Sequence, residues 1–421
     1  MQRKRLALMT SVTEKVTRNV FWTLCVMGFF AILSSTMSKT LLNPFATILQ
    51  TPTDWSGFIG AASTIPGIFV SLPASSLSDI YGRKKFLLIA GFVFASAPFL
   101  YLFINAWWQL ALVRFYHGFA TAIFVPVAEA SMAEMFPTKR GERISLFTSA
   151  TYVGRGIAPF LGGYILFATA NNNDPLYNYH LMYLSVGTAG FAAFIMALLF
   201  LAERKQPMDI KQRNLTETLK QLYRGWGIIA KNRAVLIVSF IQASLYYSYG
   251  AVEYFLSGYL KDNLQFDYFS TAAVMGSLIA LAIFVRSYMG RLSDRIGRRP
   301  PIIVGLIICA IPLVAIPFFS NLPILLLLAL IYGFGFATAT ASIPALVTEL
   351  SPKELIGTST GFLDTVMDIG QTVGPIISGF VLGTYLHYYG VFPSLSMVLL
   401  VACIIFVFSR VASNKSVKSP R

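Results

Sequence analysis

Apolar residues recur along this chain in long stretches of about twenty residues or more, separated by polar segments. A helix needs about 20 mostly apolar residues to cross the roughly 30 Å hydrocarbon core of a bilayer. The pattern therefore predicts an all-α membrane protein with twelve transmembrane helices. The predicted spans are 20–46, 55–76, 86–104, 109–133, 144–168, 181–202, 233–258, 268–289, 301–319, 323–347, 356–383 and 391–410.

The composition narrows the class further. Of 421 residues, 56% are hydrophobic and only 12% are charged, whereas a soluble domain carries about a quarter charged residues. The net charge of +15 therefore does not indicate a nucleic-acid partner; the lipid bilayer is the expected surrounding. The first apolar stretch is longer than that of a signal peptide, so we interpret it as a retained span. The three cysteines lie in apolar runs and fit no disulfide framework or metal site, so no metal or other cofactor is expected.

Basic residues set the orientation. Of 33 Lys and Arg, 29 fall in the N-terminal segment, the alternate loops and the C-terminal tail, including five counted from Arg286 to Arg299; the opposite loops hold only Lys261. Loops rich in Lys and Arg stay on the cytoplasmic side, so both termini are predicted to be cytoplasmic. The outer loops contain neither cysteine nor an N-x-[ST] site, which fits the plasma membrane of a prokaryote, the cell inner membrane.

The chain repeats itself. The segment 77–84 returns as 292–299 and the segment 118–122 returns as 335–339, at offsets of 215 and 217 residues. Matches in the same order at a nearly constant offset indicate a duplicated six-span unit with parallel halves. We therefore predict a cytoplasmic N-terminal segment, a six-helix bundle, a basic cytoplasmic linker, a second six-helix bundle and a cytoplasmic tail. Their bounds are 1–19, 20–203, 204–232, 233–411 and 412–421.

Motifs in both halves carry a family resemblance. The pattern D-x-x-G-R-[KR] occurs at Asp79 and again at Asp294, each time in the loop after the second span of a half. With twelve spans in six-plus-six form, the chain resembles the major facilitator superfamily over residues 20–411. Arg114 opens a partial match to the span 4 motif of proton-coupled members, with His117 in place of glutamine. Segment 154–163 resembles the span 5 antiporter motif, with Ala158 in place of a glycine, which implies the drug/proton antiporter branch.

The resemblance assigns roles to these motif residues. Asp79 would hold span 2 to span 11, Asp294 would hold span 8 to span 5, and the loop arginines would reach the glutamates at the inner ends of spans 4 and 10. Such a latch stabilises the inward-closed state and must break for inward opening. The predicted latch residues are Asp79, Gly82, Arg83, Glu134, Asp294, Arg295, Gly297, Arg298 and Glu349. Close helix packing is expected at Gly154, Pro159, Gly162, Gly163, Gly374 and Pro375.

Charged residues inside the spans indicate the transport path. Lys39, Arg114 and Arg155 lie in the first half, and Glu253, Asp364 and Asp368 lie in the second. Facing lipid, these six charges would cost on the order of 15–20 kcal/mol, more than the stability of a typical fold. They are therefore expected to face each other or a wet cavity at the midline, with a positive wall and a negative wall.

Helical spacing groups these charges with other polar residues. Asp364, Asp368 and Gln371 share one face of span 11, and a second polar stripe marks span 7. Because a desolvated carboxyl group can exchange a proton near neutral pH, we expect proton coupling at Asp364, Asp368 and Glu253; simple salt bridges to the cations are the alternative. The expected substrate cavity comprises Lys39, Arg114, His117, Arg155, Gln242, Tyr246, Tyr249 and Gln371, although His117 alone is more typical of packing.

Three functions can be compared. The favoured hypothesis is a secondary transporter that works by alternating access and exports small amphipathic or drug-like molecules in exchange for protons, as a monomer. The alternative is a proton symporter that imports an organic anion bound by Lys39, Arg114 and Arg155. A membrane enzyme or an inactive sensor is the third. The sequence has no Walker A motif for ATP-driven transport and no catalytic triad or metal cluster for an enzyme, so no enzymatic activity is expected.

Overall fold

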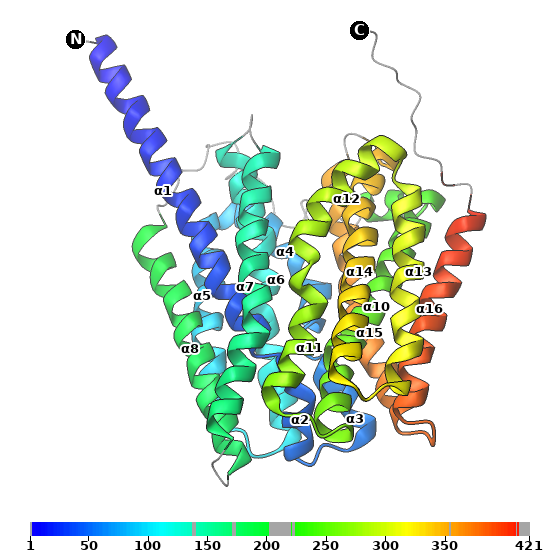
Figure 1. Cartoon of the computed structure of the whole chain (residues 1–421). Coiled ribbons are helices and arrows are strands. Elements are labelled where there is room, and N and C mark those ends of the chain that lie inside the picture. Colours follow the sequence, from blue (N-terminus) through cyan, green and yellow to red (C-terminus); the bar gives the residue numbers. More distant parts are fainter. Residues whose placement is uncertain are drawn as a thin grey trace.

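The computed structural model describes residues 2–136, 140–170, 174–201, 220, 224–352, 355–409 and 411. Within them the chain is a bundle of long helices, and the N-terminal end of α1 and the C-terminal end of α16 lie at the same end of the bundle (Figure 1). The distribution of basic residues predicts that this end is cytoplasmic; it is called the cytoplasmic end below, and the opposite end the outer end. The chain is thus an all-α membrane protein, as the apolar pattern predicted.

The first half contains eight of the described helices, and each predicted span coincides with one or two of them. They are α1 (Gln2–Met37), α2 (Leu42–Ile48), α3 (Thr53–Ala61), α4 (Ile65–Tyr81), α5 (Arg83–Leu100), α6 (Trp107–Met135), α7 (Arg140–Thr169) and α8 (Pro175–Phe200).

The second half follows the same order. Its described helices are α10 (Arg233–Gly258), the π-helical turn η3 (Tyr259–Asn263), α11 (Tyr268–Ala280), α12 (Ala282–Ile296), α13 (Arg299–Ala315), α14 (Leu322–Leu350), α15 (Ile356–Leu382) and α16 (Tyr388–Phe408). In Figure 1 the first half lies on the left and the second half on the right, except that α2 and α3 reach under the second half at the outer end.

Eleven of the described helical segments are long and apolar enough to cross a membrane. The twelfth predicted span, 144–168, is α7, a helix of 30 residues. It packs lengthwise between α1 and α11 and carries Arg143 and Arg155 along with many small and polar residues. Its lower apolarity reflects these charged and polar residues, whereas apolar side chains such as Phe160 and Tyr164 are exposed on its outer face.

The duplication extends to the breaks in the helices. In the first half, the first span breaks after α1 and the second between α3 and α4; in the second half, η3 follows α10 and Leu281 separates α11 from α12. Broken helices at matching positions of two repeats are typical of transporters, because unwound backbone lines the binding region. Here the breaks bring backbone and polar side chains to the interface between the halves.

The structure closes the outer end of the interface. Ser56 of α3 lies 3.0 Å, oxygen to oxygen, from the Tyr254 hydroxyl of α10, and Thr47 of α2 donates to Asp262 at 2.9 Å. Thr64 lies 2.7 Å from Thr372 of α15, oxygen to oxygen. These contacts join the two halves, so the outer side is shut in this conformation.

Glycines make that closure possible. A Cβ built on Gly57 of α3 would lie 2.1 Å from the carbonyl oxygen of Pro375 on α15, and one on Gly379 would lie 3.0 Å from the Gly57 nitrogen. Two helix backbones can approach this closely only where no side chain intervenes. The contact between α3 and α15 is therefore specified by glycine.

The predicted domain bounds remain an interpretation, since most of the proposed linker 204–232 and the tail 412–421 lie outside the described residues. The described end of the linker packs on the second half: Trp226 contacts Phe362 edge-to-face with ring centroids 5.9 Å apart. This contact places the end of the linker against α15.

Candidate functional site

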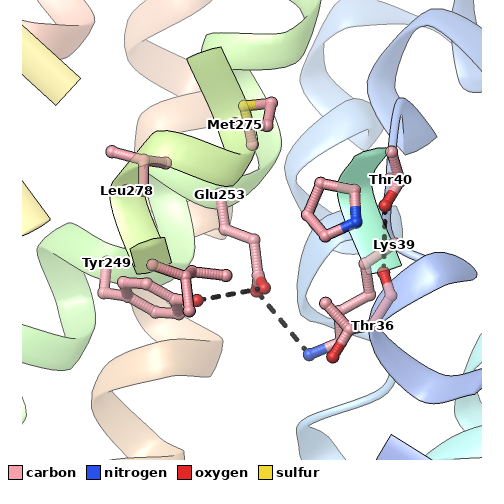
Figure 2. A pocket seen from close by; sticks show the side chains of 9 residues that line it. Thr36, Lys39, Thr40, Tyr249, Glu253, Met275 and Leu278 are labelled. Atoms are coloured by element: carbon pink, nitrogen blue, oxygen red, sulfur yellow. Dashed lines mark hydrogen bonds and ion pairs between the residues drawn. The ribbon is translucent and has the colours of Figure 1, made fainter. Parts of the chain in front are cut away.

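An ion pair bridges the two halves near the middle of the bundle. Lys39 follows the end of α1, and its Nζ lies 3.6 Å from Oε2 of Glu253 on α10. The same carboxylate accepts a hydrogen bond from the Tyr249 hydroxyl at 3.4 Å and one from the Gln371 amide at 3.5 Å. Figure 2 shows Lys39 and Glu253 pointing toward one another from opposite walls. Each of their side chains is about one-fifth exposed, so the pair is largely removed from water.

The cavity at this ion pair is small. Its volume is ≈ 20 Å³, enough for about one water molecule, whereas sites for drug-sized ligands measure about 300–1,000 Å³. A substrate can therefore occupy this place only after the halves separate. The lining residues are Thr36, Lys39, Thr40, Pro159, Tyr249, Glu253, Met275, Leu278 and Ile279.

Arg114 and His117 lie inside the first half rather than on the wall of this cavity. Arg114 is 1% exposed and donates from Nη2 to the Ser63 hydroxyl at 2.7 Å. Ser63 belongs to the break between α3 and α4. His117 is buried, and its Nδ1 lies 3.5 Å from the Tyr101 hydroxyl. In this conformation Arg114 holds the break in place and His117 packs against Tyr101 and Phe94; direct substrate contact of either residue remains a prediction.

Arg155 and Arg286 come from different halves and lie near the same tyrosine ring. Arg286 does not belong to the inner loop, as the sequence count assumed; it lies in α12, ten residues before the helix ends at Ile296. The guanidinium carbons of Arg155 and Arg286 lie 5.6 and 5.1 Å from the centroid of the Tyr152 ring. No ion pair involves either arginine among the described residues.

Acidic residues gather on the side of α6 and α15. Asp364 is exposed although it lies within a membrane-spanning helix, and its charge acts on Glu129 of α6, in the other half. Asp368 touches α4, because a Cβ on Gly67 would lie 2.2 Å from its Oδ2. The two aspartates of α15 therefore face the space between the halves rather than lipid.

Glu129 and Arg286 change the expected charge distribution. The sequence pattern placed all intramembrane cations in the first half and all acids in the second, and this division is wrong. Each half contributes both signs, because Glu129 belongs to the first half and Arg286 to the second. Arg155 and Arg286 lie on α7 and α12, whereas Glu129 and Asp364 lie on α6 and α15.

Aromatic rings line α10 and α14 next to the ion pair. Tyr249 stacks on Phe336 with centroids 4.8 Å apart, and Tyr246 meets the same ring edge-on at 5.2 Å. The charge of Arg155 acts on both tyrosines. Gln242, one turn before Tyr246, is 4% exposed, and its Oε1 has no partner among the described residues. This wall offers flat apolar surfaces with a cation nearby.

The loop motif forms a compact network at the cytoplasmic end of the first half. Arg83 pairs with Asp79 and donates to Glu134 Oε1 at 2.5 Å. It also donates to the Ser78 hydroxyl at 2.6 Å and to the Ser75 carbonyl oxygen at 2.9 Å. The arginine thus ties the end of α4 to the end of α6.

The second half repeats this network 215 residues later. Arg298 pairs with Asp294 at 2.5 Å, donates from Nε to Glu349 at 2.9 Å and donates to the Ser293 hydroxyl at 2.7 Å. Arg295 lies in the last turn of α12. The contact of each aspartate with the opposite half stays a prediction.

Gly82 and Gly297 form the tight turns of the two motifs. Their φ angles are +102° and +97°, a region that side chains with a Cβ rarely adopt. Each turn lets an arginine fold back onto the end of the preceding helix, so these two glycines position both networks.

The small residues of the span 5 and span 11 motifs lie at helix contacts. A Cβ on Gly154 would lie 2.5 Å from the Phe29 carbonyl oxygen of α1, and one on Gly163 would lie 2.1 Å from Ala272 of α11. Gly162 faces Met37 and Thr40, and Gly374 faces the Tyr247 backbone of α10. Pro159 and Pro375 lie within α7 and α15. Gly163 is thus a contact between the two halves, whereas Gly154 and Gly374 pack within one half.

Two similar helical halves that enclose buried charges at their interface define a class, the secondary transporters that carry small molecules. Comparison with known families identifies the group. The Major Facilitator Superfamily model matches residues 24–366 and 282–421. The chain belongs to the Major Facilitator Superfamily, and it is a transporter rather than an enzyme.

Relatives and solved structures agree with that assignment. The chain is 25% identical to the multi-drug resistance efflux pump PmrA homolog of Lactococcus lactis over 88% of this chain and 89% of the relative. It is 25% identical to the multidrug resistance protein MdtG of Proteus mirabilis, over 77% and 79%. The crystal structure of a D-xylose-proton symporter superposes with a TM-score of 0.76 at 15% identity, covering 94% of this chain and 98% of the symporter, which shows the shared fold alone.

Sequence reasoning missed Glu129, Arg286 and the role of Ser63. Glu129 lies within the predicted span 109–133, so the rule that charges inside spans are functional could have found it. Arg286 lies close to the predicted end of its span at residue 289, and it was counted with the basic residues of the following loop. No sequence signal marks Ser63, because the break in the second span appears only in the structure.

Proposed function

We propose that this transporter exports small amphipathic molecules across the plasma membrane in exchange for protons. The observation that carries the proposal is the Lys39–Glu253 ion pair, which joins the halves at a small cavity. The relatives named as multidrug efflux pumps support the direction of transport.

The ion pair provides a link between protonation and movement. To open the outer side, α1 and α10 must move apart, which separates Lys39 from Glu253. Breaking a buried pair costs about 3–5 kcal/mol because each charge loses its partner. A proton on Glu253 lowers that cost because it removes the negative charge. An anionic substrate group beside Lys39 lowers it because it replaces the carboxylate that Lys39 loses.

The acids on α6 and α15 provide the exchange. In this mechanism Asp364 and Asp368 hold a proton or face the bound substrate, but not both. Binding of the substrate therefore releases the proton, and binding of the proton releases the substrate. This exchange makes the transporter an antiporter. The loop networks at Asp79 and Asp294 would act as latches that hold the cytoplasmic side closed during the other half of the cycle. Because one chain contains both halves and the whole interface, the monomer suffices as the working unit.

The test uses purified protein in liposomes with an imposed pH gradient. We expect a panel of amphipathic solutes to include members that accelerate dissipation of the gradient and that move in the direction opposite to the protons. Accumulation of substrate on the side that the protons enter would contradict export. Failure of every solute to change the proton flux would contradict coupled transport altogether.

A second function, proton-coupled import of an organic anion, is supported by the unpaired Arg155. Of the three cations proposed to bind such an anion, Lys39 is paired with Glu253 and Arg114 is buried against Ser63. The same liposome experiment separates import from export by the direction of solute movement.

A further inference from the structure

Arg155 and Arg286 form a charged cluster that the mechanism above does not use. They come from α7 and α12, one in each half, and both lie against the ring of Tyr152. No ion pair among the described residues includes Arg155 or Arg286. Glu253 is paired with Lys39, and no described ion pair joins Asp364 or Asp368 to either arginine.

Neither guanidinium group forms an ion pair with a described carboxylate. Arg286 lies ten residues before the end of α12, about 15 Å along a helix axis, and therefore inside the membrane-spanning segment Tyr268–Ile296. Both arginines are half-buried, and a single tyrosine ring offsets only part of the cost of holding a cation in such a segment. An anion bound beside Tyr152 would stabilise both arginines.

We propose that Arg155, Arg286 and Tyr152 form a binding site for the carboxylate or phosphate group of an amphipathic anion. Guanidinium groups present planar pairs of donors that match both anions. The aromatic wall of Tyr246, Tyr249 and Phe336 lies within the electrostatic reach of Arg155 and supplies a surface for the apolar body. If the proposed transport function holds, on which this inference rests, the substrates are amphipathic anions.

The position of the site also connects it to transport. Because α7 and α12 belong to different halves, an anion between their arginines would hold the halves together at this place. Movement of α12 away from α7 would divide the site and release the anion. Binding and conformation are therefore coupled through the same two residues.

The test measures binding without any gradient or flux. The full-length protein in phosphatidylcholine nanodiscs is titrated with 2-naphthoate and with the uncharged 2-naphthamide, and the melting temperature is followed. We expect naphthoate to stabilise the protein and naphthamide to have at least tenfold weaker apparent affinity. The proposal is overturned if naphthoate and naphthamide stabilise the protein equally. It is also overturned if neither compound and no anionic lipid stabilises the protein.

Variants locate the site. Arg155→Gln and Arg286→Gln are each expected to weaken naphthoate binding by at least tenfold, and Arg286→Lys by less, because lysine keeps the charge but loses the paired donors. Arg291→Gln is the matched control, since Arg291 is an exposed arginine of the same helix that donates to its own backbone at Ser287. Unchanged affinity in folded Gln variants overturns the proposal; if these variants do not fold, the comparison of naphthoate with naphthamide on the unaltered protein decides.

A second arm identifies the source of the anion. The phosphate of an anionic lipid has the same chemistry as a solute anion, so phosphatidylglycerol is added to the nanodiscs in place of part of the phosphatidylcholine. Stabilisation by phosphatidylglycerol that requires Arg155 and Arg286 assigns the site to a lipid headgroup; stabilisation by naphthoate alone assigns it to a solute. A protein that binds naphthoate but shows no coupled flux contradicts the proposed transport function and leaves the anion site standing.

Discussion

The charged residues of this transporter have different tasks that depend on their partners. Lys39 is paired across the interface, Arg114 is buried against a hydroxyl, and Arg155 lies over a tyrosine ring. All three are cations within predicted spans, yet only the first closes the cavity between the halves. At the scale of the residue, function therefore follows from the partner and not from the charge alone.

The Lys39–Glu253 pair provides the sharpest test at this scale. We expect Glu253→Gln to abolish substrate-dependent proton flux in liposomes, because the amide cannot carry a proton between the two sides. Reversal of the pair, with Lys39→Glu and Glu253→Lys combined, should restore the melting temperature lost in either single variant. Glu142→Gln, which neutralises an exposed acid of α7, is the control and should behave as the unaltered protein. Normal coupled flux in Glu253→Gln would contradict the proposed role.

Asp79 tests the loop network. Arg83 pairs with Asp79 and also binds Glu134, so Asp79→Asn removes one charge and leaves the arginine anchored to α6. We expect a strong loss of transport with little change in expression or melting temperature, since a partly exposed ion pair contributes only about 0–1 kcal/mol to stability. Initial rates of solute uptake into liposomes measure the effect, with Lys85→Gln as an exposed control in the same loop. Normal transport by Asp79→Asn would show that the motif is only a topological anchor.

At the scale of the helix, the broken spans and the glycine contacts determine how the halves meet. The same spans are interrupted in both halves, which places polar side chains such as Ser63 and Thr64 at the interface. Helix α3 then crosses to the second half and packs on α15 through Gly57. The outer closure depends on backbone contact, so it is sensitive to a single added methyl group.

Gly57→Ala is expected to weaken that closure. The new Cβ would lie 2.1 Å from a backbone oxygen of Pro375, and overpacking of this kind costs about 1–3 kcal/mol. In a background with Thr372→Cys, labelling by a membrane-impermeant maleimide from the outside should become faster, because the outer side opens more often. Gly156→Ala is the control, since no atom lies within 4 Å of its added Cβ. Equal labelling rates in both variants would contradict a role of Gly57 in closure.

At the scale of the molecule, transport requires that the two halves move against each other. The outer closure joins α2, α3 and the break at Thr64 of one half to η3, α10 and α15 of the other through hydrogen bonds. The small cavity at Lys39 leaves no room for a drug-sized substrate beside the ion pair in this conformation. The structure is therefore one state in a cycle, and the halves must separate on the outer side for a substrate to pass.

A reversible cross-link tests this requirement. Thr64→Cys combined with Thr372→Cys places two sulfurs where hydroxyl oxygens now lie 2.7 Å apart, so a disulfide is expected to form under mild oxidation. The oxidised double variant should be unable to transport, and reduction should restore the activity. Each single variant serves as the control and should be insensitive to the oxidant. Full transport by the cross-linked protein would mean that the outer side does not open there.

Much of this protein was predictable from the sequence. Long apolar stretches determine the membrane-spanning helices, because a helix in lipid must satisfy its own backbone and present apolar side chains. The repeat at an offset of 215 residues predicted two similar halves, and the paired motifs predicted the superfamily. Local patterns suffice for these features because each depends on one helix or on one turn.

Only the tertiary structure decided which charges meet. The sequence separated the intramembrane charges by half, whereas in the structure each half holds both signs, and Arg155 and Arg286 from opposite halves lie near the same Tyr152 ring. It also revealed that Arg114 is buried and that Lys39 is paired with Glu253. Such pairings join residues from opposite halves, and their geometry depends on how two whole bundles pack and on where their helices break. The sequence pattern determines which residues share a face of each helix. It does not determine how one bundle is rotated against the other or how closely the two bundles pack.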